Sequence, residues 1–265
     1  RGEFSEGRFN GYGNLVYADG RKYEGEFKNN QRHGEGKMTM PDGSFYNGEW
    51  RGDQPHGQGT MNYPGGDTYR GDFKEGQRDG EGTMNTLDGR VYVGEFEEDI
   101  MQGIGIMTMP DGTVIEGEWQ NGELAGDGKM TMPDGSVYEG KWLDGQPHGV
   151  GHWDHSDGET YSGDFKEGQR HGEGILTTVD GRIYTGKFEE GMIEGWGRMT
   201  LLDGTIIEGE WRDGAPRGQV ILIQPDGTSF EGKWQNGQLE GEGKVIQPDG
   251  GVIKGRWEDG EFRME

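Results

Sequence analysis

A strict interval of 23 residues constrains the fold of this chain more than any other feature of its sequence. A tyrosine or another large apolar residue recurs at this interval, a glycine follows two residues later, and Phe or Trp follows two residues after that. Because a fixed period of this length marks an array of equivalent units, we expect a single repeat array over residues 1–265, with a partial repeat at 1–22. The full repeats start at Tyr23, Tyr46, Tyr69, Tyr92, Ile115, Tyr138, Tyr161, Tyr184, Ile207, Phe230 and Ile253.

Each repeat is predicted to form a β-hairpin. The stretch Tyr-Glu-Gly-Lys-Trp at 138–142 alternates between two kinds of side chain, as a strand does. Turn signals flank it, with Pro-Asp-Gly at 133–135 and a looser stretch at 143–148. Only 28% of the residues are hydrophobic and 56 are glycine, which is too little apolar material for a two-layer core. We therefore expect an all-β protein, an elongated single-layer antiparallel sheet of tandem hairpins that forms a twisted open ribbon.

The two turns of a repeat predict the strand register. A three-residue Pro-Asp-Gly loop with a left-handed glycine pairs Met130 with Tyr138. A six-residue turn on the other side pairs Tyr138 with Trp153 and Trp142 with Gly149. Both turns place tyrosine, methionine and tryptophan on one face, between rows of glycine. Polar and charged residues are predicted to occupy most of the opposite face.

The Tyr-x-Gly-x-Trp/Phe step, followed by Gly-x-Gly and then Asp-Gly at a 23-residue period, resembles the MORN (membrane occupation and recognition nexus) repeat family. The resemblance covers essentially the whole chain. It implies a scaffold or adaptor, often in cytoskeletal, ciliary or membrane-associated assemblies, and an association with phospholipids. A longer period is superimposed: YRGDFKEGQRDGEG at 69–82 recurs as YSGDFKEGQRHGEG at 161–174, which indicates that a block of four repeats was duplicated.

The aromatic and methionine rows predict a surface that binds a peptide or helix of a partner protein. A single layer has nothing to cover the outer side of these rings, so we expect an exposed apolar face. Methionine suits such a surface because its side chain adapts to different partners. The predicted partner-binding residues are Met38, Tyr46, Trp50, Met61, Tyr63, Tyr69, Met84, Tyr92, Met107, Trp119, Met130, Tyr138, Trp142, Trp153 and Tyr161.

Membrane association is an alternative with little support from charge. The net charge of −24 opposes anionic headgroups and nucleic acid. Residues 1–56 are close to neutral, with eight Lys/Arg and nine Asp/Glu, so any lipid contact is expected there. The candidate lipid-contacting residues are Lys22, Lys28, Arg32, Lys37 and Arg51.

Catalysis and metal binding are not predicted, and no cofactor is expected. The carboxylates recur with the repeat, and the aspartates of the tight turns are explained by turn chemistry. His148, His152, His155 and His171 cluster in the sequence, but strand alternation and turn spacing do not bring them to one ion.

The remaining expectations concern the setting of the chain. With no cysteine, no apolar run long enough for a bilayer and no visible signal peptide, we expect a cytoplasmic protein. The family resemblance adds an association with the cytoskeleton or a cilium. The open sheet ends allow a homodimer through unpaired edges. A targeting or regulatory domain of a larger enzyme is a further alternative.

Overall fold

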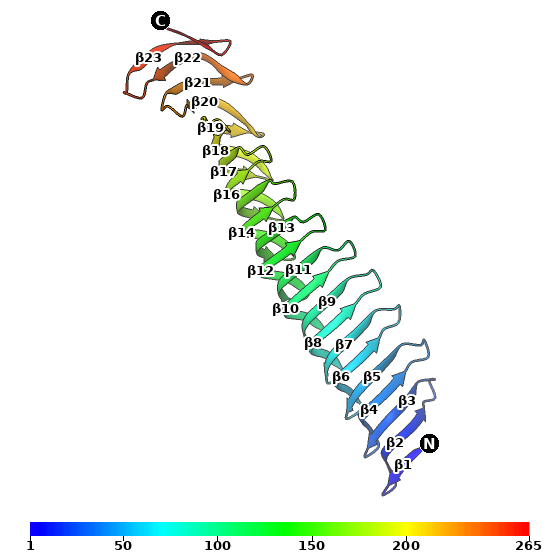
Figure 1. The fold of residues 1–265 in the computed structure, drawn as a ribbon. Helices are drawn as coiled ribbons and strands as arrows, with labels where there is room; N and C mark the ends of the chain where they lie inside the picture. Colours follow the sequence, from blue (N-terminus) through cyan, green and yellow to red (C-terminus); the bar gives the residue numbers. More distant parts are fainter. Residues whose placement is uncertain (265) are drawn as a thin grey trace. The chain divides into compact units, whose positions relative to one another are not determined.

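The computed structural model describes residues 1–264, and these residues form strands and turns without a helix. The contacts divide the chain into two compact units, Arg1–Pro133 and Asp134 onward. Figure 1 shows that the hairpins follow one another in chain order within each unit. In the first unit the strands are β1 (Gly2–Ser5), β2 (Arg8–Val16), β3 (Lys22–Lys28), β4 (Gln31–Thr39), β5 (Phe45–Arg51), β6 (Gln54–Asn62), β7 (Thr68–Lys74), β8 (Gln77–Asn85), β9 (Val91–Glu97), β10 (Ile100–Thr108), β11 (Val114–Gln120) and β12 (Glu123–Thr131).

The second unit repeats the same alternation of a seven-residue and a nine-residue strand. Its strands are β13 (Val137–Leu143), β14 (Gln146–Asp154), β15 (Thr160–Lys166), β16 (Gln169–Thr177), β17 (Ile183–Glu189), β18 (Met192–Thr200), β19 (Ile206–Arg212), β20 (Ala215–Ile223), β21 (Ser229–Gln235), β22 (Gln238–Ile246), β23 (Val252–Glu258) and β24 (Glu261–Met264). Within each unit every strand pairs antiparallel with its neighbours in the chain, and the sheet is open, so the predicted all-β fold of tandem hairpins is confirmed.

The Pro-Asp-Gly turn has the geometry that the sequence predicts. In the β10–β11 hairpin the Gly112 N–H donates to the Met109 carbonyl at 2.9 Å, and the Met109 N–H donates to the Thr113 carbonyl at 2.8 Å. Gly112 is left-handed, with φ 93°, as a type I turn followed by a G1 bulge requires. The Asp111 carboxylate accepts from the Thr113 N–H at 2.9 Å, and this bond lowers the pKa of Asp111.

The other turn is tighter than the sequence-based register assumes. Asp144 and Gly145 form a two-residue turn with φ 50° and 71°, and Leu143 pairs with Gln146. Trp142 consequently lies opposite Pro147 and not opposite Gly149, so that part of the prediction is wrong.

A bulge in the longer strand restores the predicted register beyond this turn. The pairing shifts between Gly140 and Trp142, and Gly149 in the extra segment is left-handed with φ 67°. The predicted pair of Tyr138 with Trp153 is confirmed.

The core is one row of alternating rings on one face of the sheet. Tyr46 packs edge-on against Trp50 of its own repeat, with ring centroids 5.1 Å apart, and against Phe73 of the next repeat at 4.9 Å. The Tyr46 hydroxyl donates to the Glu49 carbonyl at 2.8 Å, at the bulge where the ladder is interrupted. Because of these contacts the Tyr46 side chain is almost inaccessible to solvent, and the residue is 1% exposed.

The glycine rows make room for these rings. A Cβ atom on Gly59 would lie 2.5 Å from the Cε2 atom of Tyr46, closer than any real contact allows. Gly59 pairs with Gly48, so the ring lies directly over two bare backbones. Glycine is therefore required for packing here, and its cost in conformational entropy is offset by burial of the ring.

Candidate functional site

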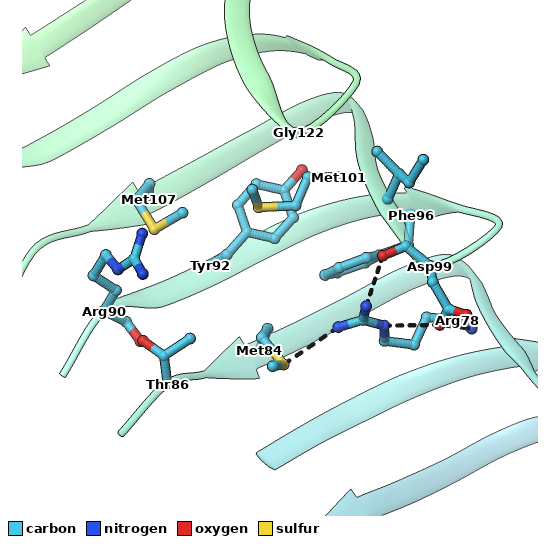
Figure 2. Close-up of a pocket in the computed structure, with 11 residues that line it drawn as sticks. Arg78, Met84, Thr86, Arg90, Tyr92, Phe96, Asp99, Met101, Met107 and Gly122 are labelled. Carbon is cyan, nitrogen blue, oxygen red and sulfur yellow. Dashed lines mark hydrogen bonds and ion pairs between the residues drawn. The ribbon is translucent and has the colours of Figure 1, made fainter. Parts of the chain in front are cut away.

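The ring face of the first unit contains a cavity of about 360 Å³. Its lining comes from β8, β9 and β10, from the turns between them, and from Gly122 in the next turn (Figure 2). Met84, Tyr92 and Met107, three of the predicted partner-binding residues, line it together. Strand alternation predicted that these residues share one face, and their side chains do lie together there. Figure 2 shows the two methionine sulfurs and the Tyr92 ring directed toward the same space.

Three methionines and an isoleucine make the cavity mainly apolar. Met101 and Ile100 add to Met84 and Met107, and they were not part of the predicted surface. Burial raises the pKa of the Tyr92 phenol to about 12, so this group stays neutral and acts as packing surface. The cavity therefore offers thioether and hydrocarbon surface to a ligand.

Arg78 closes one side of the cavity. Its Nε lies 3.0 Å from Asp99 Oδ1, and one terminal nitrogen donates to the Asp99 carbonyl at 2.6 Å. Another terminal nitrogen lies 3.5 Å from the Met84 sulfur, and the guanidinium covers the Phe96 ring at 5.2 Å. Asp99 itself is left-handed with φ 72°, in the turn position that Gly145 occupies in its own hairpin. The arginine is thus fixed by charge, ring and sulfur contacts at once.

A second arginine lies at the opposite side of the cavity. Arg90 is in the tight turn before β9, and its Nε is 2.9 Å from Asp88 Oδ2. Both arginines of the lining are therefore neutralised by a carboxylate, and the cavity has no unpaired charge from them.

The sequence-based register misses one row of residues on the ring face. Each of them pairs with a Phe or Trp across the two-residue turn of its hairpin. Phe73 pairs with Arg78 and Phe96 pairs with Met101 on the ring face. The mistaken six-residue turn assigned these positions to a loop, although their 23-residue spacing could have revealed them. The row consists of Phe9, Arg32, Pro55, Arg78, Met101, Leu124, Pro147, Arg170, Ile193, Pro216, Leu239 and Phe262.

The expectation that the rings of this face are open to water is wrong for most of the predicted residues. Each ring is enclosed by rings of its own and the adjacent repeat, and the missed row adds cover on the same face. The buried members are Met38, Tyr46, Trp50, Tyr69, Tyr92, Met107, Trp119, Tyr138, Trp142 and Tyr161, all 8% exposed or less. The half-buried members are Met61, Tyr63, Met84, Met130 and Trp153. Contact of any of them with a partner stays a prediction.

The five candidate lipid-contacting residues do not share one face. Lys22, Lys28, Lys37 and Arg51 are exposed and alternate with the ring-face residues, whereas Arg32 lies on the ring face opposite Phe27. Arg32 is held by Asp53, 3.1 Å from its Nε, and lies 4.3 Å above the Trp50 ring. Lipid contact by this set stays a prediction, and Arg32 is already engaged.

The clustered histidines take separate roles. His152 lies between Ser162 and Asp154, with its Nε2 2.9 Å from Asp154 Oδ1, whereas His155 stacks on the Trp153 ring at 5.2 Å. Over residues 1–264 no group of three or more His, Asp or Glu side chains is placed to hold a metal ion. In the same residues no helix is long and apolar enough to cross a membrane.

The family model of the MORN repeat matches eleven consecutive segments of the chain. They are residues 1–20, 23–45, 46–68, 69–85, 92–114, 116–137, 138–160, 161–181, 184–206, 208–229 and 230–252. The chain therefore belongs to the MORN repeat family. No curated protein matches it.

Solved structures are similar to this chain at low identity. The TCP10 domain of Danio rerio CPAP, in complex with a peptide of Danio rerio STIL, is 13% identical, with 91% of this chain and 97% of that chain covered and a TM-score of 0.42. The SAS-4 (dCPAP) TCP domain, in complex with a proline-rich motif of Ana2 (dSTIL) of Drosophila melanogaster, is 14% identical, with 67% and 90% covered and a TM-score of 0.37.

Proposed function

We propose that this chain is a non-catalytic scaffold that holds a peptide or helix of a partner protein against its ring face. The observation that carries the proposal is the cavity of about 360 Å³ over Met84, Met101 and Met107. Binding sites for small apolar groups are concave and mostly apolar, with a few polar groups at the edge. Flexible thioether side chains adapt to more than one partner shape.

The partner is proposed to insert an apolar side chain between the two paired arginines. Arg78 and Arg90 are each matched by an aspartate, so an additional carboxylate would have to compete with Asp99 or Asp88. A leucine, methionine or phenylalanine of the partner needs no such exchange. Its burial would contribute about 2 kcal/mol through the area removed from water.

The buried tyrosines have a supporting role in this proposal. Tyr92 lines the cavity but is only 1% exposed, so contact is left mainly to the methionines. Tyr69, 0% exposed, lies outside the lining and supports it by packing against Phe96 with ring centroids 5.1 Å apart. The proposed contact surface thus keeps the half-buried members and Met107, with Met101 and Ile100 added.

A peptide library displayed on phage tests the proposal directly. Selected peptides should bind the wild type saturably, and the double variant Met84→Ser/Met101→Ser should bind them about tenfold more weakly. Leu87→Ser is the matched control, because Leu87 is 75% exposed in a turn and outside the cavity. Equal affinity of wild type and double variant, with unchanged circular dichroism, would contradict the proposal.

A further inference from the structure

The face opposite the rings has an apolar patch at one place in the first unit. Val93, Ile104 and Ile106 are 47%, 65% and 42% exposed. Val93 pairs with Ile106, and the Ile104 N–H donates to the Glu95 carboxylate at 3.3 Å. The three side chains thus project from β9 and β10, two adjacent strands, on the face opposite the methionine cavity.

The patch is a departure from the repeat. The positions equivalent to Val93, Ile104 and Ile106 in the preceding repeat are Arg70, Glu81 and Thr83, and in the following repeat they are Glu116, Asp127 and Lys129. In no other repeat of the sequence are all three positions apolar. Nothing in the hairpin requires the change, because the same backbone carries polar residues in the neighbouring repeats.

Carboxylates surround this patch. Ile104 pairs with Glu118 on one side and has Glu95 on the other, and Glu81 pairs with Glu95 one strand further. Ile106 pairs with Glu116. Since adjacent strands are about 4.8 Å apart, these carboxylates lie within about 10 Å of Ile104.

The four carboxylates are not neutralised by the protein itself. In the described part of the chain, residues 1–264, none of Glu81, Glu95, Glu116 and Glu118 forms an ion pair. Arg70 and Lys129 lie in the same cross-strand row as the patch, and Lys129 pairs with Glu116 without an ion pair. Four carboxylates without an ion-pair partner, next to exposed branched side chains, are complementary to a basic segment that carries an apolar residue.

We propose that this acidic-rimmed patch, formed by Val93, Ile104 and Ile106 with the four glutamates around them, binds a lysine- or arginine-rich segment of a partner protein. The segment places one or two branched apolar side chains on Ile104 and Ile106, and its cations lie over the glutamates. This second surface is independent of the methionine cavity, because it is on the opposite face of the same strands. A scaffold with both surfaces holds two different segments at once.

A second copy of this chain is a poorer occupant. Two such patches in contact would bring two sets of unpaired glutamates together, and the net charge of −24 on each chain adds repulsion. An anionic lipid surface is disfavoured for the same reason.

The test uses a fluorescein-labelled peptide built of lysine, isoleucine and serine, and the same peptide with glutamate in place of lysine. The full chain should bind the basic peptide saturably and the acidic one not at all. Binding should weaken as salt rises, because exposed charges are screened over about 8 Å at physiological ionic strength.

The decisive variant replaces the patch with uncharged residues that stand at these positions in other repeats: Val93→Thr, Ile104→Gln and Ile106→Thr. Its affinity for the basic peptide should fall about tenfold, a change of about 1.4 kcal/mol. The charge-reversal variant Glu116→Lys/Glu118→Lys should lose a similar factor without any change in apolar surface. Unchanged affinity in both variants, or no saturable binding to the wild type, would overturn the proposal.

Two controls separate this surface from the methionine cavity and from self-association. The cavity variant Met84→Ser/Met101→Ser should bind the basic peptide as the wild type does; a loss there would assign the peptide to the cavity and overturn the proposal. Sedimentation equilibrium tests the second copy. A dimer that disappears in the triple patch variant would overturn the choice of occupant.

Discussion

The two copies of the near-identical segment, residues 69–82 and 161–174, direct the same arginine to different partners. Both arginines lie over the tyrosine of their own repeat, with Arg78 5.7 Å from the Tyr69 ring and Arg170 5.6 Å from the Tyr161 ring. Arg78 is then held by Asp99 in the following turn. Arg170 instead donates to a Glu159 carboxylate oxygen at 2.6 Å, which belongs to the preceding hairpin.

The turn that follows each arginine differs between the copies. Asp99 and Gly191 are equivalent, and both are left-handed, with φ 72° and 83°. Only the aspartate offers a carboxylate, so the arginine of the second copy has none in that turn. The acceptor of Arg170 also differs, because Glu159 stands where the first copy has the shorter Asp67. Two turn positions on an otherwise similar ring face therefore account for where the positive charge lies.

The largest expected effect concerns the packing that both copies share, a tyrosine ring over paired glycines. Gly82→Ala and Gly174→Ala should each destabilise their copy by about 3 kcal/mol, because a methyl group would overlap the ring of Tyr69 or Tyr161. Hydrogen exchange of the amides in β7–β8 and β15–β16 measures the local opening free energy. Unequal losses would mean that the two cores differ more than their geometry indicates. Gly251→Ala is the control for replacing a glycine as such, because Gly251 is not left-handed and the added methyl would meet only the flexible side chains of Gln247 and Asp249.

The next largest effect is the loss of stability on replacing the arginine, and it should differ between the two copies. Arg78→Met should cost about 2 kcal/mol, since it breaks one hydrogen bond to the Asp99 carboxylate and one to the Asp99 carbonyl, and leaves the carboxylate with the Arg78 main-chain N–H alone. Arg170→Met should cost about 1 kcal/mol, because Arg170 makes a single ion pair with Glu159. Urea denaturation followed by tryptophan fluorescence compares them. A larger loss for Arg170→Met would contradict the assigned partners.

Exchanging the residues at turn positions 99 and 191 should change the ion-pair partners of Arg78 and Arg170. In Gly191→Asp the new carboxylate should draw Arg170 away from Glu159, and in Asp99→Gly the Arg78 guanidinium should lose its fixed position. We expect each change in stability to stay below about 1 kcal/mol, because the ion pair favours aspartate in this turn whereas the left-handed backbone favours glycine. The chemical shifts of the arginine Nε nuclei report the exchange; unchanged shifts in both variants would refute it.

The smallest expected effect is the pH dependence of stability that comes from the turn aspartates, and it should be the same in both copies. The Thr86 hydroxyl lowers the pKa of Asp88 and the Thr178 hydroxyl lowers the pKa of Asp180, in each case with help from the arginine two residues later. A carboxyl whose pKa is depressed in the folded state stabilises the fold above its ordinary value of 3.8 and loses this contribution as the pH falls further.

Thermal unfolding between pH 6 and pH 2.5 measures that contribution. The midpoint should fall as the pH drops below about 4, and Asp88→Asn and Asp180→Asn should flatten the profile equally. A flat wild-type profile, or an effect confined to one copy, would contradict equal turn chemistry.

Much of the fold could be predicted from the sequence because its determinants are local. The Pro-Asp-Gly turn and the tyrosine over paired glycines follow from the residues at 107–117 and 46–59 alone. The two-residue turn at Asp144–Gly145 could also have been recognised, since Asp-Gly is a common type I′ pair. The bulge after it is marked by the left-handed Gly149, but the sequence-based register places this glycine in a regular pair with Trp142. The burial of the rings depends on that bulge, so the accessible part of the candidate site was misjudged.

The sharing of each tyrosine ring between two repeats has a consequence for how such a chain can evolve. Tyr46 packs against Trp50 of its own repeat and Phe73 of the next, and Tyr161 packs in the same way against Phe165 and Phe188. These junctions are thus chemically equivalent, so unequal recombination can add or remove whole units without creating an unmatched interface. A deletion of any other length would place a ring over the wrong backbone. Gene duplication in multiples of the unit is the permitted route of change, and selection can then adjust single turn residues afterwards.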